Sequence, residues 1–396
     1  MELKSITVKN YKSLQNIQLK DIPKFLMIVG ANGTGKSSFF DIFGFLRDAL
    51  VGNVRQALDA RGRFSEVVTR EHEHESIFFE LQVRAPIAGT QRLVTYGLEI
   101  GQEGGRPVVL HEYLRYKRGR HGAPYYFLDF RKGKGFAITN EEDFSKSDEN
   151  LEREEQQLES PDILAIKGLG QFQRFKAANA LRQLLENWHV SDFHINAARG
   201  RKEATGEVEH LSVTGENLPR VAQFLYENHR TVFEKILKRM QQRVPGMQGV
   251  EPELTKDGYL ILRFRDGTFK TPFLDRYVSD GTIKMFAYLV LLHDPKPHPL
   301  LCVEEPENQL YPSLMGELAE EFRGYANRGG QVMVSTHSPD LLNAMRLEEV
   351  YWLVKENGVS SIRRAQEDAQ VVAYMKEGDK MGSLWKQGFF AGADPQ

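Results

Sequence analysis

The sequence predicts an α/β fold that combines a core, in which a glycine-rich loop joins a buried strand to a helix, with an antiparallel β lobe and a helical insertion. Residues 25–29 form an unbroken apolar run, typical of a strand buried on both faces, and a glycine-rich loop and an apolar helix follow it. Three β-rich runs with turn residues between them, 76–84, 92–100 and 108–116, predict an antiparallel meander. Apolar residues at helical spacing over 217–243 predict the main helical part.

The composition describes an ordinary folded protein. Its 396 residues are 41% hydrophobic and 27% charged, with a formal net charge of −2, so any surface for nucleic acid would be a local patch. The N-terminus lacks the apolar core of a secretion signal, and the run from Met285 to Leu292 is too short to span a bilayer. Cys302 is the single cysteine and lies in an apolar run, as a small buried hydrophobe would. We therefore expect a reduced, cytoplasmic protein with no membrane partner.

The remaining segments are assigned from local patterns. Two short strands are expected before residue 25, and the acidic stretch from Glu141 to Glu159 is expected to be an exposed helix or a flexible segment. Residues 171–189 have the apolar spacing of a helix. Residues 259–264 and 269–273 are expected to be strands joined by the Asp266-Gly267 turn.

The stretch from Gly30 to Ser38 has the spacing G-x-x-x-x-G-K-S of a phosphate-binding loop. Its glycines let successive backbone N–H groups face phosphate oxygens, and the N-terminus of the following helix adds partial positive charge. Lys36 is expected to reach the β- and γ-phosphates and Ser37 to ligate Mg²⁺. A chance glycine-rich turn is the alternative, and the full match between a strand and a helix disfavours it. The predicted nucleotide-binding residues are Gly30, Asn32, Gly33, Thr34, Gly35, Lys36, Ser37 and Ser38.

Three further motifs lie in the last third of the chain. Ser279 and Gly281 open an apolar helix in "YVSDGTIKMFAYLVLL". An apolar run ends at Glu304 and Glu305 in "LLCVEEPENQLYP", and His337 follows another in "VMVSTHSPDLL". Taken alone, each could be a simpler feature, such as a helix cap or a structural histidine. Their order after a phosphate loop, and the placement of carboxylates at a strand end, favour one nucleotide site.

Together with "VGANGTGKSS", these motifs resemble the ABC-type ATPases of the RecF/Rad50/SMC/OLD branch, most closely the stand-alone AAA-family (AAA-21-like) predicted ATPases found in bacterial anti-phage defence systems. The resemblance implies an ABC-type head with a mixed central sheet, and a homodimer that meets head to tail around two ATP molecules. It implies that Glu305 is the general base and that His337 holds the γ-phosphate. Ser279 and Gly281 of the other subunit would close over that phosphate, and Asn308 would communicate across the dimer.

Glu304 departs from the resembling family, which usually has Asp at this position. It keeps a carboxylate for a water-mediated role at Mg²⁺, on a longer side chain. Gln171 and Gln173 match the family's Q-loop by order alone, and surface polar residues on a helix are the favoured interpretation of them.

The resemblance divides the chain into three parts. Residues 1–150 would be the first half of the ATPase head with the β lobe, 151–255 a helical insertion or lid, and 256–396 the second half of the head. Only 59 residues follow His337, which is 396 minus 337 and too few for the nuclease domain of longer OLD relatives.

The implied function is an ATP-hydrolysing switch or sensor for a separate effector, a nuclease or toxin, as a dimer or a higher oligomer. Two alternatives stay open: a RecF/Rad50-like ATPase that binds DNA in repair, and a slow-turnover ATP-bound scaffold.

Several charged stretches are interpreted as solvated surface. The run from Glu71 to Glu75 carries His72 and His74, but no third ligand follows at a suitable spacing, so a solvated segment is favoured over a metal site. The basic turns 117–121 and 131–134, and the pair Arg199 and Arg201, could contact a nucleic-acid backbone, although hairpin tips are commonly charged.

Overall fold

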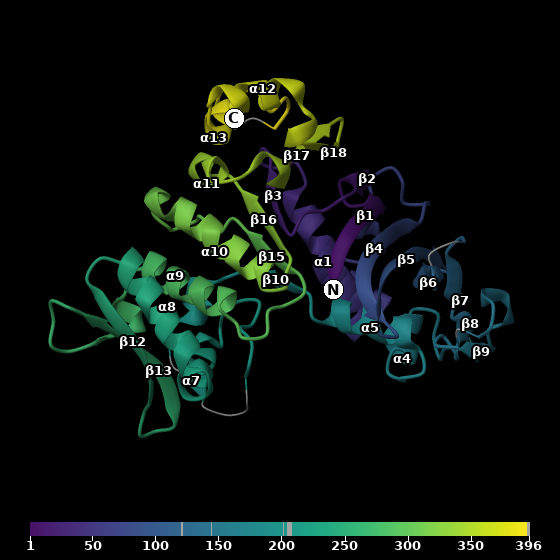
Figure 1. The fold of residues 1–396 in the computed structure, drawn as a ribbon, viewed down its shortest axis with the longest axis horizontal. Helices are drawn as coiled ribbons and strands as arrows, with labels where there is room; N and C mark the ends of the chain where they lie inside the picture. The colour runs from purple at the N-terminus through teal and green to yellow at the C-terminus, as the bar shows by residue number, and fades with distance from the viewer. Residues whose placement is uncertain (120–121, 144, 201, 204–207, 394–396) are drawn as a thin grey trace.

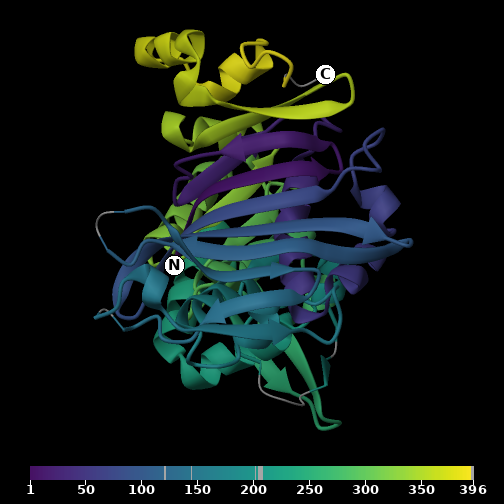
Figure 2. The same ribbon diagram turned by 90° about the vertical axis from the view of Figure 1, so that its right-hand side faces the viewer.

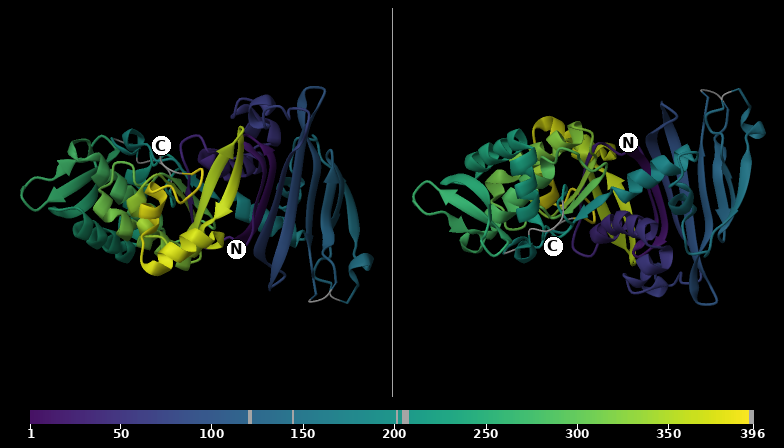
Figure 3. Two further views of the ribbon diagram at one scale, coloured as in Figure 1. Left: turned by 90° about the horizontal axis from the view of Figure 1, so that it is seen from above. Right: turned by 90° about the horizontal axis from the view of Figure 1, so that it is seen from below.

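The computed structural model describes residues 1–119, 122–143, 145–200, 202–203 and 208–393. These residues form layers (Figures 1 and 3). An antiparallel sheet lies on one side, helix α1 (Lys36–Val51) packs between it and a central sheet, and further helices cover the far face of the central sheet. One hydrophobic cluster fills each side of the central sheet. The predicted α/β class is confirmed.

The central sheet places the ends of several strands at one edge. Its order is β10-β15-β16-β3-β17-β18, parallel from β10 to β17 with β18 antiparallel at the end. β16 lies between β15 and β3, so the segments that follow these three strands meet at the same edge. The strands are β10 (His189–Ser191), β15 (Leu301–Glu304), β16 (Val332–Thr336), β3 (Phe25–Val29), β17 (Val350–Glu356) and β18 (Val359–Arg364).

The antiparallel sheet extends the predicted meander at both ends and is seen face-on in Figure 2. The two strands before residue 25 join it as β2-β1, and three strands after residue 116 continue it. In sheet order its strands are β2 (Leu14–Leu19), β1 (Glu2–Tyr11), β4 (Ile77–Ile87), β5 (Thr90–Glu103), β6 (Arg106–Tyr116), β7 (Tyr125–Arg131), β8 (Lys134–Ile138) and β9 (Arg153–Gln157).

The acidic stretch after β8 differs from its prediction. In place of an exposed helix it contains a 3₁₀ turn (Asp148–Asn150) and strand β9. Glu141 is 3% exposed, and its carboxylate accepts hydrogen bonds from the Tyr116 hydroxyl at 2.9 Å and the Ala177 backbone N–H at 3.1 Å. The Glu141 carboxylate therefore holds the β lobe against helix α5 (Lys176–Glu186). The acidic segment is part of the folded structure.

The helical part is also more divided than predicted. The continuous helix expected over 217–243 breaks at His229, whose φ of −134° leaves the helical region. The strand that begins at Tyr259 pairs mainly with an upstream strand, β12 (Met247–Leu254), which the sequence did not indicate. After the turn, only Phe273–Leu274 forms a strand, β14.

The other elements are α2 (Val54–Asp59), α3 (Phe64–Val67), α4 (Ala165–Leu169), α5 (Lys176–Glu186), α6 (Ile195–Ala198), β11 (Lys202–Glu203), α7 (Leu218–Asn228), α8 (Arg230–Arg243), β12 (Met247–Leu254), β13 (Tyr259–Asp266), α9 (Asp280–Leu292), α10 (Met315–Asn327), α11 (Pro339–Asn343), α12 (Ala369–Glu377) and α13 (Met381–Lys386). The helix predicted over 171–189 is therefore shorter and begins at Lys176. Within the predicted insertion 151–255, β9 belongs to the antiparallel sheet and β10 to the central sheet, so the segment is not purely helical. Its boundaries stay a prediction. Across the described ranges, no helix combines the length and apolar character that a bilayer span requires.

Two buried carboxyls make the stability of the β lobe depend on pH. Burial raises the pKa of Glu112 and of Glu141 to about 7, although hydrogen bonds from backbone N–H and tyrosine hydroxyl groups oppose the shift. The folded chain therefore holds protons that the unfolded chain releases above about pH 4.5. The unfolding free energy should fall as pH rises from about 4.5 to about 7, by up to about 3 kcal/mol per carboxyl.

We predict that Glu112→Gln weakens this pH dependence, measured by chemical denaturation at pH 5 and pH 7.5. Glu155→Gln, at an exposed position of β9, is the matched control and should leave the dependence unchanged. Equal pH dependence in the wild type and Glu112→Gln would contradict the assignment.

Candidate nucleotide-binding site

The loop between β3 and α1 has the backbone that anion binding requires. Gly33 and Gly35 have φ of +77° and +100°, and a Cβ at Gly35 would lie 2.6 Å from the Ser13 Oγ and 2.7 Å from the Ser360 Oγ. Glycine is therefore required there by both conformation and space. Helix α1 has no side-chain cap and no acidic residue in its first turn. Its first N–H groups thus keep their hydrogen-bonding capacity and partial positive charge for an anion.

Lys36 is buried beneath this loop. Its Nζ donates to the Gly30 carbonyl at 2.8 Å and to the Ala31 carbonyl at 3.0 Å. Burial lowers the pKa of Lys36, while the neighbouring carboxylates of Glu305 and Glu304 act in the opposite direction. The ammonium group is thus held at the loop by carbonyl oxygens and faces an acidic edge. Such a group gains strongly from a nearby anion, because little water screens it.

Ser37 and Glu304 bring together the oxygen ligands predicted for Mg²⁺. The Ser37 Oγ donates to the Glu304 Oε2 at 2.6 Å. Burial raises the pKa of Glu304, opposed by this hydrogen bond. A hydroxyl and a carboxylate beside a phosphate-binding loop fit Mg²⁺, which prefers oxygen ligands and is bound by few protein groups when phosphates and water supply the rest. Asn32 is exposed and Thr34 is buried, with its Oγ1 donating to the Ala31 carbonyl at 2.9 Å.

Glu305 lies just past the end of β15 in a conformation that is rare for a residue with a side chain. Its φ of +43° is in the left-handed region. Its carboxylate is fixed at both oxygens: Oε1 lies 2.8 Å from the His337 Nε2, and Oε2 accepts from the Asn308 Nδ2 at 3.0 Å. Such backbone strain costs on the order of 1–3 kcal/mol and occurs preferentially at functional sites. The structure therefore brings the three residues Glu305, Asn308 and His337 together.

Glu307 completes this edge, although sequence reasoning did not single it out. Its Oε1 accepts from the Thr336 Oγ1 at 2.6 Å and from the His337 backbone N–H at 2.7 Å. Its Oε2 is buried, and none of the described residues forms a hydrogen bond with it. Glu307 thus fastens the end of β16 to the loop after β15 and sets the position of the histidine. The available signal was its place in "VEEPENQ", two residues after Glu305.

Ser279 and Gly281 lie against the loop that follows Glu305. The Ser279 Oγ caps helix α9 by accepting from the Thr282 N–H at 3.2 Å. A Cβ at Gly281 would lie 2.6 Å from the Gln309 carbonyl oxygen, and the Lys284 Nζ donates to the Asn308 carbonyl at 2.8 Å. The start of α9 is therefore packed on residues 308–309 of its own chain.

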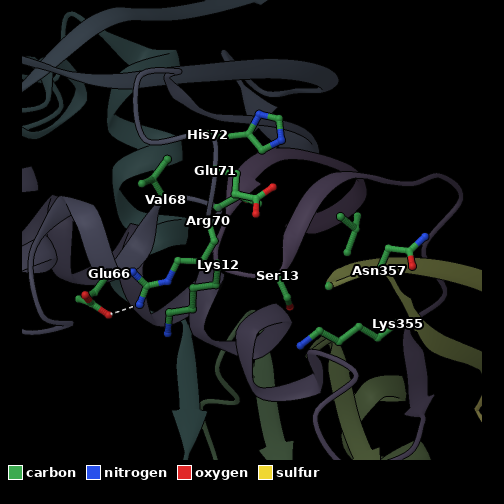
Figure 4. Close-up of a pocket in the computed structure, with 12 residues that line it drawn as sticks. Lys12, Ser13, Glu66, Val68, Arg70, Glu71, His72, Lys355 and Asn357 are labelled. Atoms are coloured by element: carbon green, nitrogen blue, oxygen red, sulfur yellow. Dashed lines mark hydrogen bonds and ion pairs between the residues drawn. The ribbon is translucent and has the colours of Figure 1, made fainter.

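A cleft of about 460 Å³ borders the phosphate loop, and no sequence pattern indicated it. Figure 4 shows its walls, with Lys12 and Ser13 between β1 and β2, Glu66 in α3, residues 68–72 after that helix, and Lys355 in β17. The Ser360 Oγ donates to the Thr34 carbonyl at 2.7 Å, which ties the β17–β18 hairpin to the phosphate loop. A cleft of this size suits a small-molecule group.

The charged side chains for which the sequence left a metal or nucleic-acid role open are largely paired within the chain. His72 contacts Glu75 at 2.7 Å and Gln15 at 2.6 Å, as expected of a local hydrogen-bonded turn. Arg118 is buried and donates to Asp148 at 2.7 Å, so it does not present a charge for nucleic acid.

Arg199, the first residue of the other basic pair, is also bonded within its own chain. Arg199 donates to the Val278 carbonyl and to Asp280, at 2.6 and 2.5 Å. Its expected neighbour Arg201, and residues 120–121 of the first basic turn, lie outside the described residues. Gln171 and Gln173 are exposed in the connection between α4 and α5, where Gln171 donates to the Lys167 carbonyl at 3.3 Å.

The central sheet is mixed, and an antiparallel sheet accompanies it. One edge of the central sheet carries the phosphate loop after β3, the carboxylates after β15 and the histidine after β16. This arrangement defines an ABC-type P-loop ATPase fold. A family model described as "AAA domain, putative AbiEii toxin, Type IV TA system" matches residues 126–343, and one described as "AAA ATPase domain" matches residues 1–92. The first match spans more than half of the chain, so the protein belongs to that AAA-domain family. No curated protein matches the chain.

Two solved structures are similar to this chain. An SMC head bound to the C-winged helix domain of ScpA is similar at a TM-score of 0.55 and 14% identity, covering 92% of this chain and 98% of that one. The SMC head domain from Thermotoga maritima is similar at a TM-score of 0.46 and 16% identity, covering 92% of this chain and 99% of that one. The first likeness shows that the chain has the fold of an SMC head.

Proposed function

We propose that this chain binds and hydrolyses ATP with Mg²⁺, and that it works as a dimeric nucleotide-dependent switch for a separate effector, a nuclease or toxin, in anti-phage defence. The observation that supports hydrolysis is the fixed carboxylate of Glu305, held by His337 and Asn308 beside the phosphate loop. The family's description, which names a putative AbiEii toxin of a type IV TA system, supports a role in a toxin–antitoxin system. The separate effector and the anti-phage role rest on the resemblance of the motifs to stand-alone ATPases of defence systems.

The chemistry follows from the position of each group. Lys36 and the N-terminus of α1 stabilise negative charge on the β- and γ-phosphates, and the cleft beside them receives the nucleoside. Mg²⁺, held through Ser37 and Glu304, supplies further neutralisation of the phosphate charge when bound. Glu305 orients and polarises the attacking water as general base. His337 releases Glu305 and contacts the γ-phosphate when nucleotide is present.

The proposed second subunit completes the nucleotide site. Ser279 and Gly281 pack on residues 308–309 of their own chain, and the motif resemblance assigns them to the phosphates of a partner subunit. Tyr277 and Tyr311 flank these two segments and are 68% and 77% exposed. Large exposed aromatic side chains are enriched at protein interfaces. We therefore place the dimer interface on this surface.

The test is ATP turnover and oligomeric state for the wild type and Glu305→Gln. Removing a general base lowers turnover by about 10²–10⁴-fold. Because Gln keeps the shape of the side chain, the variant should still bind ATP and should accumulate as an ATP-stabilised dimer, seen by size-exclusion chromatography with light scattering. Wild-type turnover in Glu305→Gln would show that another group is the base.

The same assay separates the switch from the DNA-binding alternative. Turnover should be indifferent to duplex DNA if a protein effector controls the site. Strong stimulation by DNA would instead support a RecF/Rad50-like repair function. A measured turnover near zero in the wild type, with ATP retained through purification, would support the slow scaffold.

A further inference from the structure

A cluster of ligand-forming side chains lies at the sheet edge opposite the nucleotide site. His210 precedes α7, while Asp294 and His298 lie in the connection between α9 and β15. One nitrogen or oxygen from each residue lies within 4.8 Å of the others. The connection leads into the amino end of β15, whereas Glu304 and Glu305 follow its carboxyl end. The cluster is therefore separate from the nucleotide-binding residues.

We propose that His210, Asp294 and His298 bind a divalent transition-metal ion, with Zn²⁺ as the expected class. Two imidazoles and one carboxylate are a common protein ligand set for Zn²⁺, with a fourth position for water or another ligand. Zn²⁺ bonds to such ligands are about 2.0–2.2 Å long. The distance between the two ligand atoms that lie farthest apart in the cluster therefore needs to shorten by roughly 1 to 1.5 Å. Side-chain rotation can supply a movement of this size.

The hydrogen bonds of His298 select the nitrogen that would bind the ion. Its Nδ1 lies 3.2 Å from the Asn187 carbonyl oxygen, which can only accept, so Nδ1 carries the proton. The Nε2 of the neutral ring then has a free lone pair, and this atom is buried with no hydrogen-bond partner in the part of the chain that the structure describes. A histidine that donates one ring N–H to a carbonyl and offers the other nitrogen is the usual arrangement around a bound metal.

Asp294 and His210 are also held in place. Asp294 is buried, its Oδ1 accepts from the Lys296 N–H at 2.8 Å, and its Oδ2 lies 2.6 Å from the His210 Nδ1. The His210 carbonyl accepts from the Asn217 Nδ2 at 2.9 Å, which fixes the turn before α7. An ion pair between Asp294 and His210 alone would be simpler, but it leaves the Nε2 of His298 unused.

The surroundings of the cluster give the ion an approach. A cavity of about 520 Å³ is lined by His189, His210 and His298. The ring of His189 stacks on that of His298 with centroids 4.6 Å apart, and the Nε2 of His189 is likewise buried without a hydrogen-bond partner among the described residues. A bound ion would tie the turn before α7 to the central sheet.

The experiment titrates the metal-free full-length chain with Co²⁺ and follows the visible absorption of the bound ion, then displaces it with Zn²⁺. We expect one ion per chain and a higher thermal unfolding temperature in Zn²⁺. His298→Ala should weaken Co²⁺ binding by more than about 100-fold, since losing even an outer-shell partner costs about 10–100-fold. It should also abolish the thermal shift. His74→Ala, at an exposed position outside the cluster, is the matched control and should bind as the wild type does.

The outcomes distinguish a metal site from a plain ion pair between His210 and Asp294. His298→Ala keeps that pair, so equal Co²⁺ binding in this variant and the wild type would overturn the proposal. Absence of saturable one-to-one binding in the folded wild type would also overturn it. If His298→Ala does not fold, His210→Ala tests the same ligand set. Glu305→Gln should bind Co²⁺ normally at this cluster, so failure of the ATPase proposal leaves this result interpretable.

Discussion

Lys36→Ala should reduce ATP affinity by at least about 100-fold and remove measurable hydrolysis. Each hydrogen bond to a charged group contributes about 1.5–3 kcal/mol, and every 1.4 kcal/mol is about tenfold in affinity, so losing two such bonds to phosphate gives this magnitude. The ammonium group is already buried and held by the Gly30 and Ala31 carbonyls, so it needs little rearrangement to meet an anion. Binding is measured by calorimetry with ATP and Mg²⁺.

A matched variant separates loss of this contact from a general loss of charge. Lys4→Ala removes a lysine that pairs with Glu2 in β1, and it should bind ATP as the wild type does. Lys36→Ala loses two hydrogen bonds to backbone carbonyls, but it also removes a buried charge, whose burial is unfavourable. The thermal unfolding temperature of this variant without nucleotide should therefore stay close to the wild-type value. Wild-type ATP affinity in a folded Lys36→Ala protein would contradict the assignment of the phosphate loop.

The core of the fold was predictable because its signals are local. The β3 run is apolar at every position, the loop after it has a fixed spacing, and helix α9 begins at a serine cap. Each feature can be read within about ten residues. A strand buried on both faces is apolar at every position, and the glycine-rich loop directly after it marks its end, which explains why residues 25–29 were assigned correctly.

The errors arose where distant residues override local composition. The stretch around Glu141 is acidic, which indicates solvation, but Tyr116 and the N-terminus of α5 bury this carboxylate. Strand β12 contains Pro252 and charged residues, which argue against a strand, yet it lies at a sheet edge where proline is tolerated. His229 interrupts a continuous apolar periodicity with neither glycine nor proline to mark the break.

The candidate sites likewise combine residues that a local motif identifies with residues that only the fold brings together. Glu305, Asn308 and His337 could be named from their motifs, and the structure brings them into contact, but Ser360 reaches the phosphate loop from 326 residues away. His210, Asp294 and His298 have no characteristic spacing, since 84 residues separate the first two. The run at Glu71 to Glu75 looked more like a metal motif in the sequence than this cluster did.

A heterodimer of two inactive variants should recover roughly half of the wild-type turnover if the sites form between subunits, because one of its two sites is then intact. One chain carries Lys36→Ala and the other Ser279→Asp. Asp retains the helix-capping function of Ser279 but places a carboxylate toward the γ-phosphate, so that homodimer should be folded and inactive. The two chains carry different affinity tags and are purified through both.

The control heterodimer pairs Lys36→Ala with Glu305→Gln. Both residues lie at the same edge of one chain's central sheet, so each of its two sites carries one defect and no turnover should return. Recovery in the first mixture alone requires that Ser279 act on the phosphates of the partner subunit. Recovery in both would mean that a chain's phosphate loop and Glu305 act in different sites. Recovery in neither would contradict head-to-tail assembly of independently acting sites, and the position of Ser279 against residues 308–309 would then have only a structural role.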